Sequence, residues 1–138
     1  MGHSDKVSGT EASDFASFDF TTSGNNDRLL LVAAFGVGPK FEPFAVDSVT
    51  YNGVNMTRAA SADLRDRRQK MLHRSEVFYL LEADMPVSGA HPVEIHFSHT
   101  PDSSIEYEAI EHWDATQEAP STGDLYLQMG WPFSLLDD

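Results

Sequence analysis

Short runs of strand-forming residues, separated by frequent turn signals, constrain the fold of this chain more than any other feature of its sequence. The clearest signal is Asn52-Gly53, which lies between the β-rich runs 48–51 and 54–59. Both central positions of a type I′ hairpin turn need positive φ angles, and Asn-Gly adopts them readily. Other clusters of turn residues lie at 21–27, 36–39, 82–91 and 100–103. These frequent turn signals are unfavourable to long helices and predict an all-β fold.

The hydrophobic pattern within the runs has the period of β-strands. Residues 29–35 (LLLVAAF) are continuously apolar and predict a strand that is buried on both faces. Residues 71–81 predict a long strand, because Val, Phe and Tyr favour β-structure. Alternating apolar and polar residues predict half-exposed strands at 16–20, 93–97 and 105–109. We therefore expect a single antiparallel β-sandwich, jelly-roll or immunoglobulin-like, of about seven to eight strands.

Other segments are predicted to lie outside this regular structure. Residues 36–39 are expected to end the apolar strand, and residues 61–70 are expected to form a charged loop or one helical turn. At 138 residues the chain has the size of one domain. We expect a flexible arm at 1–13, the sandwich at 14–130, and an apolar and then acidic tail at 131–138.

The charge of the chain is strongly negative and makes some classes of binding partner unfavourable. There are 22 acidic and 9 basic residues, and the formal net charge is −13. General binding to nucleic acids or to anionic membranes needs a basic surface, so we expect neither partner. The chain contains no cysteine, which excludes disulfides and thiolate chemistry. Its first residues lack the apolar core of a signal peptide, so we expect it to stay where it is made, or to leave by assembly or lysis rather than by the general secretory route.

Several segments in a fixed order resemble a known group of domains. They are 26–32 (NDRLLLV), 49–57 (VTYNGVNMT) and 76–80 (EVFYL), with 91–98 and 113–116 (WDAT) fitting the same pattern. Together they resemble a loose group of β-sandwich domains found in bacterial surface proteins and phage structural proteins. The shared motifs are structural and imply no catalytic residues. Such domains continue with further strands where this chain stops, so the resemblance implies sheet edges that a partner completes.

Five of the nine basic residues are concentrated within ten positions of an otherwise acidic chain. They are Arg65, Arg67, Arg68, Lys70 and Arg74. Such a cluster predicts a loop that docks an acidic or phosphorylated partner through forked guanidinium contacts. The alternative is a solvated loop in which these arginines pair with Asp63, Asp66 and Glu76.

Apolar and aromatic side chains provide further candidates for binding. A small domain rarely leaves an apolar run in water, so the tail either folds back on its own sheet or packs on a neighbouring subunit. The tail residues concerned are Trp131, Phe133, Leu135 and Leu136. Exposed aromatic rings also stack on sugars, with packing in the core as the alternative. The candidates for glycan stacking are Tyr51, Tyr107 and Trp113.

Histidines beside carboxylates are the candidates for a metal site. The weak candidates are His96, His99 and His112. We expect Glu94 and His96 to share one face of a strand, and we expect His112 on the same face of its neighbour. The spacing matches no established metal motif, and the alternative is a solvated acidic face, so no metal and no cofactor is predicted. The chain also lacks a GxSxG nucleophile motif, and we expect no enzymatic activity.

These observations favour a non-enzymatic structural or interaction module. The expected partners are other protein subunits, in a homo-oligomer or a larger assembly. The resemblance makes a virion component, such as a capsid decoration or a fibre or spike protein, the most concrete form of this expectation. The alternative is a carbohydrate-binding or adhesive β-sandwich module, whose exposed rings would bind a glycan.

Overall fold

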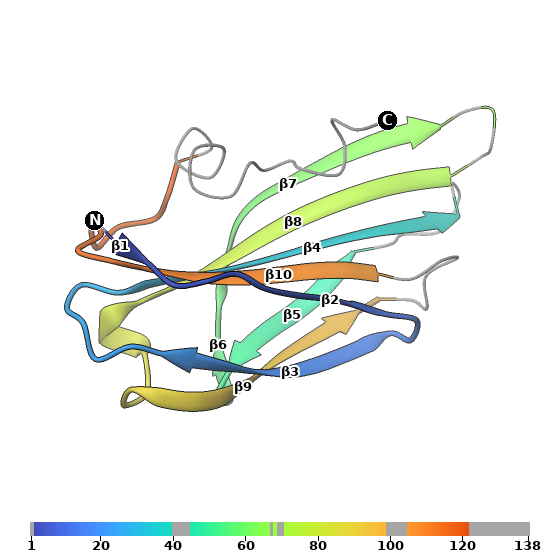
Figure 1. The fold of residues 1–138 in the computed structure, drawn as a ribbon. Helices are drawn as coiled ribbons and strands as arrows, with labels where there is room; N and C mark the ends of the chain where they lie inside the picture. The colour runs from blue at the N-terminus through green and yellow to red at the C-terminus, as the bar shows by residue number, and fades with distance from the viewer. Residues whose placement is uncertain (1, 40–44, 67, 69–70, 99–104, 122–138) are drawn as a thin grey trace.

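The computed structural model describes residues 2–39, 45–66, 68, 71–98 and 105–121, and these residues form two antiparallel β-sheets that pack on each other (Figure 1). The arrangement confirms the predicted all-β class and the predicted packing of two sheets. Within the described residues the only helical segment is a single 3₁₀ turn, η1 (Glu82–Asp84). No described segment forms a helix of the length and apolar character that crossing a membrane requires.

Ten strands occur among the described residues, two of them only two residues long. In chain order they are β1 (Gly2–His3), β2 (Val7–Glu11), β3 (Phe15–Thr22), β4 (Leu29–Pro39), β5 (Val46–Tyr51), β6 (Val54–Asn55), β7 (Thr57–Asp66), β8 (Met71–Leu81), β9 (Gly89–Phe97) and β10 (Ile105–Trp113). The larger sheet has the order β1-β10-β4-β8-β7, with β2 also paired to β10. The smaller sheet has the order β3-β9-β5-β6.

β4 lies at the centre of the larger sheet and confirms the predicted buried strand. It pairs with β10 on one side and with β8 on the other, and residues 29–34 are all buried. Leu30 and Val32 belong to the main core, which the smaller sheet shares. Leu31 and Ala33 point to the opposite face and belong to a second apolar cluster on the outside of the larger sheet. The larger sheet is therefore apolar on both faces around β4.

The larger sheet also extends farther than the sequence pattern indicates. β4 does not end at Gly36 but continues to Pro39, and β7 runs to Asp66 in place of the expected loop or helical turn. Both predictions are wrong for the same reason. β8 is long, and its ladder provides hydrogen-bonding partners for β4 along its whole length and for β7 from Met71 to Tyr79. This pairing overrides the weak intrinsic β-propensity of glycine and of the charged residues.

The N-terminal segment is not a flexible arm, which corrects the prediction for residues 1–13. β2 pairs with β10 along its whole length, and β1 pairs with the end of the same strand. Gly9 permits this pairing, since a Cβ at that position would clash with the side chain of Tyr107. The segment is ordered by a strand that is distant in sequence, and its polar composition carries no sign of this partner.

The Asn52-Gly53 turn is confirmed and supports a first test of the fold. Asn52 has a φ of 50° and Gly53 a φ of 77°, as a type I′ turn between β5 and β6 requires. Gly53→Val is expected to lower the free energy of unfolding by about 1–2 kcal/mol, because a β-branched residue is strained at positive φ. Urea denaturation measures the change, with Gly24→Val, at an exposed glycine without positive φ, as the control. An equal loss in both variants would contradict the turn assignment.

The two ends of the larger sheet carry different features. One end carries the β3–β4 connection and η1, and it is called the pocket end below. There Leu29, the first residue of β4, lies opposite Leu81, the last residue of β8. The other end is called the hairpin end. There Met71, the first residue of β8, lies opposite both Pro39 of β4 and Asp66, the last residue of β7. Figure 1 shows the two ends on opposite sides of the molecule.

Candidate functional site

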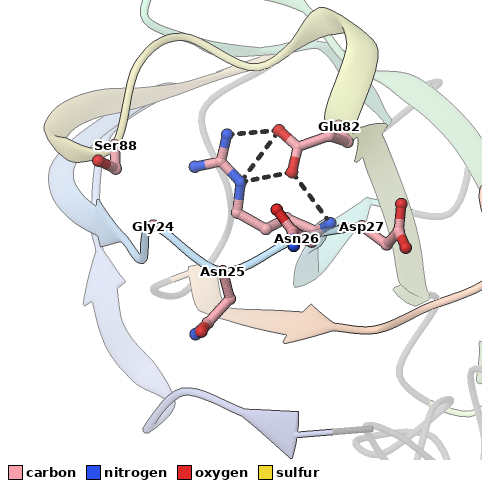
Figure 2. A pocket seen from close by; sticks show the side chains of 7 residues that line it. Gly24, Asn25, Asn26, Asp27, Glu82 and Ser88 are labelled. Carbon is pink, nitrogen blue, oxygen red and sulfur yellow. Dashed lines mark hydrogen bonds and ion pairs between the residues drawn. The ribbon is translucent and has the colours of Figure 1, made fainter.

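A polar pocket lies at the pocket end of the sandwich (Figure 2). Its volume is about 530 Å³, within the range of ligand-binding cavities. The β3–β4 connection and the segment that follows β8 form its walls. The lining residues are Gly24, Asn25, Asn26, Asp27, Arg28, Glu82 and Ser88. All of them are polar or glycine, so the pocket offers hydrogen bonds and charge rather than an apolar surface.

An ion pair between Arg28 and Glu82 fixes one wall of the pocket. The Nε atom of Arg28 donates to both carboxylate oxygens of Glu82, at 2.9 and 3.1 Å, and Nη2 lies 2.5 Å from Oε2. The remaining Nη1 donates to the carbonyl oxygen of Ser23 at 2.8 Å. The side-chain hydrogen bond between the pair lowers the pKa of Glu82 and raises the pKa of Arg28. Glu82 therefore remains ionised at neutral pH and offsets the charge of Arg28.

The β3–β4 connection is held by the segment that follows β10. The main-chain N–H of Asp114 donates to the carbonyl oxygen of Asn26 at 3.0 Å, and that of Ala115 donates to Asp27 at 2.9 Å. Asp27 has a φ of 54°, a left-handed conformation that aspartate tolerates better than most residues. These bonds keep the wall that carries Asn26 and Asp27 in one position.

Two further side chains join the walls of the pocket. The Oε1 atom of Gln117 accepts the main-chain N–H of Glu82 at 2.9 Å, and its Nε2 donates to the carbonyl oxygen of Arg28 at 3.2 Å. The carboxylate of Glu111 is fully buried and accepts the main-chain N–H of Ser23 at 3.0 and 3.2 Å. Two segments thus line the pocket, and a third, distant in sequence, holds them together through Glu111 and Gln117.

The pocket and its surroundings are acidic. Asp27 is exposed in the lining, and Arg28 is the only base among the described lining residues. Exposed carboxylates on the segments that hold the pocket are Asp84, Asp114 and Glu118. Because its pKa is low, Glu82 is a poor proton donor at neutral pH, and the described lining contains no histidine. The arrangement therefore favours the binding of a cation or a hydrogen-bonding ligand over acid–base catalysis.

The sequence pattern does not reveal this site. It identifies residues 21–27 only as a turn, although Gly24 to Asp27 form one wall of the pocket. The opposite wall is formed by Glu82 and Ser88, and Glu82 lies 54 positions from its partner Arg28. The turn composition was the only available signal, because nothing in the local pattern connects these two segments.

The predicted basic loop lies at the hairpin end, and only part of it is a loop. Arg65 lies in β7, Arg74 lies in β8 and Arg68 lies in the exposed turn between them. Arg67 and Lys70 lie outside the described residues. The prediction of a single docking loop is corrected to a hairpin, because the pairing of β7 with β8 extends into the basic segment.

Arg74 belongs to an ion-pair network around a buried carboxylate. Its Nη1 lies 3.0 Å from Oδ1 of Asp63, and its Nε lies 3.3 Å from Oε2 of Glu76. Arg58 contacts the other oxygen of Glu76 at 2.6 Å, and the main-chain N–H of Val46 donates to Oε2 at 2.5 Å. Glu76 is only 1% exposed, so these partners replace the hydrogen bonds that water would give to an exposed carboxylate. For Arg74 the alternative interpretation, pairing with Asp63 and Glu76, is confirmed.

The aromatic residues predicted for glycan stacking occupy different environments. Tyr51 is fully buried and donates its hydroxyl to the carbonyl oxygen of Phe20 at 2.8 Å, so the prediction that its ring stacks on a sugar is wrong. The same burial raises the pKa of Tyr51. Tyr107 stacks on Phe18 with the ring centres 4.5 Å apart, and Trp113 is half-buried at the end of β10. The tail residues Trp131, Phe133, Leu135 and Leu136 lie outside the described residues.

The weak candidates for metal ligands do not lie together in the structure. His96 is exposed on β9 of the smaller sheet, next to the ring of Phe15, whereas His112 lies on β10 of the larger sheet. The two strands are not neighbours, so the expectation that His112 lies on the strand next to that of His96 is wrong. His99 lies outside the described residues. In the described part of the chain no group of three or more His, Asp or Glu side chains is arranged to hold a metal ion.

Buried His112 gives the fold an expected response to acid. Its side chain is 4% exposed, and Nε2 has no hydrogen-bond partner among the described residues. Burial, together with the ring of His3 at 5.7 Å, lowers the pKa of His112. The unfolded chain, with a histidine pKa of about 6.5, then binds the proton first, so stability falls as the pH drops below that value. Urea denaturation should show the advantage of the wild type over His112→Gln shrinking from about pH 8 to about pH 5; a constant difference would contradict the assignment.

Comparison of the chain with protein-family models, with curated proteins and with solved structures finds no match. The fold, the polar pocket and the distribution of charge are therefore the observations that indicate a function. Of these, the separation of the basic hairpin from the acidic pocket distinguishes the two ends of the molecule most clearly.

Proposed function

We propose that this chain is a non-enzymatic interaction module that joins other protein subunits in a homo-oligomer or a larger assembly. Its most concrete form is a virion component, such as a capsid decoration or a fibre or spike protein, with a jelly-roll or immunoglobulin-like sandwich. The virion role is supported by the resemblance of 26–32, 49–57 and 76–80 to β-sandwich domains of phage structural proteins. The observation that carries the interaction role is the β7–β8 hairpin, which combines an open sheet edge with concentrated positive charge.

The open edge belongs to β7, the last strand of the larger sheet. No described strand pairs with its outer side. An edge of ten residues offers unpaired N–H and C=O groups to a strand of another chain. The register shift between Arg58 and Ala60 bends the beginning of this edge. A partner strand would therefore pair with the regular part, from Ala60 to Asp66.

The same hairpin concentrates the positive charge of the molecule. Between the start of β7 and the end of β8 the sequence contains six of the nine bases and only three acids, Asp63, Asp66 and Glu76. The six bases are Arg58, Arg65, Arg67, Arg68, Lys70 and Arg74. An acidic partner, including a second copy with its net charge of −13, is steered toward this end. Exposed ion pairs contribute only about 0–1 kcal/mol each and are screened by salt. The charge therefore accelerates encounter, and strand pairing stabilises the complex.

Sedimentation velocity on the whole chain tests this proposal. The wild type is expected to form a defined oligomer whose association weakens as salt increases. Arg68→Glu is expected to slow association and to reduce its salt dependence, because it removes positive charge from the hairpin turn. Lys6→Glu makes the same change of charge on the N-terminal segment and is the matched control. A wild type that remains monomeric at low and at high salt would overturn the proposal.

The alternative is a carbohydrate-binding or adhesive module, and the polar pocket is the observation that favours it. Asn25, Asn26, Asp27 and Ser88 provide groups that hydrogen-bond the hydroxyls of a sugar. A monomer that binds a polysaccharide, and that loses this binding in Asn26→Ala, would support the alternative over the assembly role.

A further inference from the structure

We propose that His3 and His112 together bind a divalent transition-metal ion such as zinc. The site is separate from the polar pocket, whose described lining contains neither residue, and it goes beyond the proposed interaction function. Three observations support it. One ring is buried with an unpartnered nitrogen atom, a second ring is held beside it, and the separation of the two rings suits a shared ion.

His112 carries the nitrogen atom that lacks a partner. The residue is only 4% exposed, and its Nε2 atom has no hydrogen-bond partner among the described residues. Leaving a buried polar atom unpaired is unfavourable, so such an atom in a folded protein indicates an ion or another ligand beside it. The nitrogen lone pair of a neutral imidazole is the group with which histidine binds transition metals.

His3 places a second ring beside that of His112. The two residues lie directly opposite each other in the pairing of β1 with β10, and Figure 1 shows β1 next to the last part of β10. The N–H of Ser4 donates to the carbonyl oxygen of Glu111 at 2.8 Å in the adjacent pair. Bonded and non-bonded pairs alternate along an antiparallel ladder, so His3 and His112 form a non-bonded pair, in which side chains lie closest.

The distance between the two rings suits a shared metal ion. The ring centres are 5.7 Å apart, and the ring planes are inclined at 54°. Zn–N bonds of about 2.0–2.1 Å at tetrahedral angles place the ring centres of two histidine ligands about 5–6 Å apart. The two rings therefore need little movement to bind the same ion.

The hydrogen bond of His3 directs its other nitrogen to the metal. Its Nδ1 lies 2.8 Å from the carbonyl oxygen of Ser4, and because a carbonyl oxygen only accepts, Nδ1 carries the proton. The lone pair of the neutral ring is then on Nε2. Metal-binding histidines usually make this bond, from the second ring nitrogen to a carbonyl or carboxylate oxygen. Ser4 is itself fixed, because its Oγ accepts the main-chain N–H of Glu111 at 3.0 Å.

The position of β1 keeps the pair ordered and accessible. A Cβ on Gly2 would clash with the ring of Trp113, so glycine is what permits β1 to lie this close to the end of β10. β1 is at the end of the strand order of the larger sheet and His3 is exposed, so an ion reaches the pair from the solvent. No third His, Asp or Glu among the described residues joins the pair, so water completes the coordination, as at open zinc sites.

The chemistry of the two ligands selects the ion. Imidazole suits zinc and copper, whereas magnesium and calcium prefer oxygen ligands. The net charge of −13 attracts every cation, and exposed carboxylates bind cations weakly without either histidine. The experiment therefore has to separate the histidine pair from this background.

Isothermal titration calorimetry of the whole chain with zinc chloride tests the proposal, and one ion per chain is expected. His3→Gln removes the exposed ligand and is expected to bind zinc at least about tenfold more weakly, because the loss of even an outer partner of a metal ligand costs about 10–100-fold. Its circular dichroism spectrum is expected to be unchanged, because His3 is exposed. His96→Gln removes an exposed histidine of the smaller sheet and is the matched control, with binding like that of the wild type.

Two further measurements identify the ligands independently of affinity. Copper(II) binds such sites more tightly than zinc, and its electron paramagnetic resonance spectrum is expected to show nitrogen couplings from two imidazoles in the wild type and from one in His3→Gln. Zinc is also expected to raise the urea midpoint of the wild type but not that of His3→Gln, since it binds the folded pair.

Three results would overturn the proposal. The first is a wild type that binds zinc no more tightly than magnesium, and the second is an unchanged zinc affinity in His3→Gln. The third is an equal loss in His3→Gln and His96→Gln, which would place the ion on other residues. None of them affects the proposed interaction function, because sedimentation velocity tests that function without added metal.

Discussion

Leu31→Ala is expected to lower the free energy of unfolding by about 2–5 kcal/mol, the largest change in stability that we predict. Leu31 is 0% exposed and lies near the start of β4, between Tyr79 of β8 and Ile110 of β10. Hydrogen-bonded neighbours on both sides hold the backbone in place, so the surroundings collapse little into the cavity that the alanine leaves.

Urea denaturation measures this loss, and the exposed residue Val87 provides its control. The side chain of Val87 is 81% exposed, so Val87→Ala should change the free energy of unfolding by less than about 0.5 kcal/mol. A loss of that small size in Leu31→Ala as well would show that the cluster on the outer face of the larger sheet is not part of the core.

Glu76→Leu is expected to cost about 2–4 kcal/mol, because it removes the buried carboxylate that three groups share. The main-chain N–H of Val46 loses its acceptor, and Arg58 and Arg74 lose their common partner. The side chain of Arg58 is 45% exposed and regains contact with water, which keeps the cost below that of an isolated buried charge.

The matched control for this network is Asp63→Ala. It removes a partner of Arg74 that lies at the surface, and an exposed ion pair contributes only about 0–1 kcal/mol. Denaturation of both variants under the same conditions should therefore show a clearly larger loss for Glu76→Leu. Equal losses would mean that burial of Glu76 is not what gives the network its effect on stability.

Local sequence pattern is sufficient where neighbouring residues determine the structure. The continuous apolar run from Leu29 to Phe35 has no stable position except between two apolar layers, and the Asn52-Gly53 turn depends only on the backbone freedom of its two residues. The same holds for the strand at 71–81, where Val77, Phe78 and Tyr79 favour β-structure.

Pairing between distant segments is what the pattern does not contain. The polar segment Val7–Glu11 becomes a strand only because β10 offers it an edge, and Gly36 to Pro39 remain extended because β8 is long enough to pair with them. Chain composition indicates the basic segment, but it does not show that Arg74 pairs with Asp63 and Glu76. The polar pocket was equally inaccessible, since its two walls meet only in the folded chain.

The pairing of β1 and β2 with β10 also has a consequence for the synthesis of the chain. β4, β7 and β8 are adjacent in the larger sheet, and they can pair as soon as β8 has left the ribosome. β2 and the free side of β4 must wait for β10. At about 5–20 residues per second, the roughly one hundred residues between β2 and β10 take about 5–20 s to synthesise. The edge of β2 stays unpaired throughout this interval, and the free side of β4 stays unpaired once β4 has been made, so a ribosome that stalls between β8 and residue 105 presents both of them to chaperones.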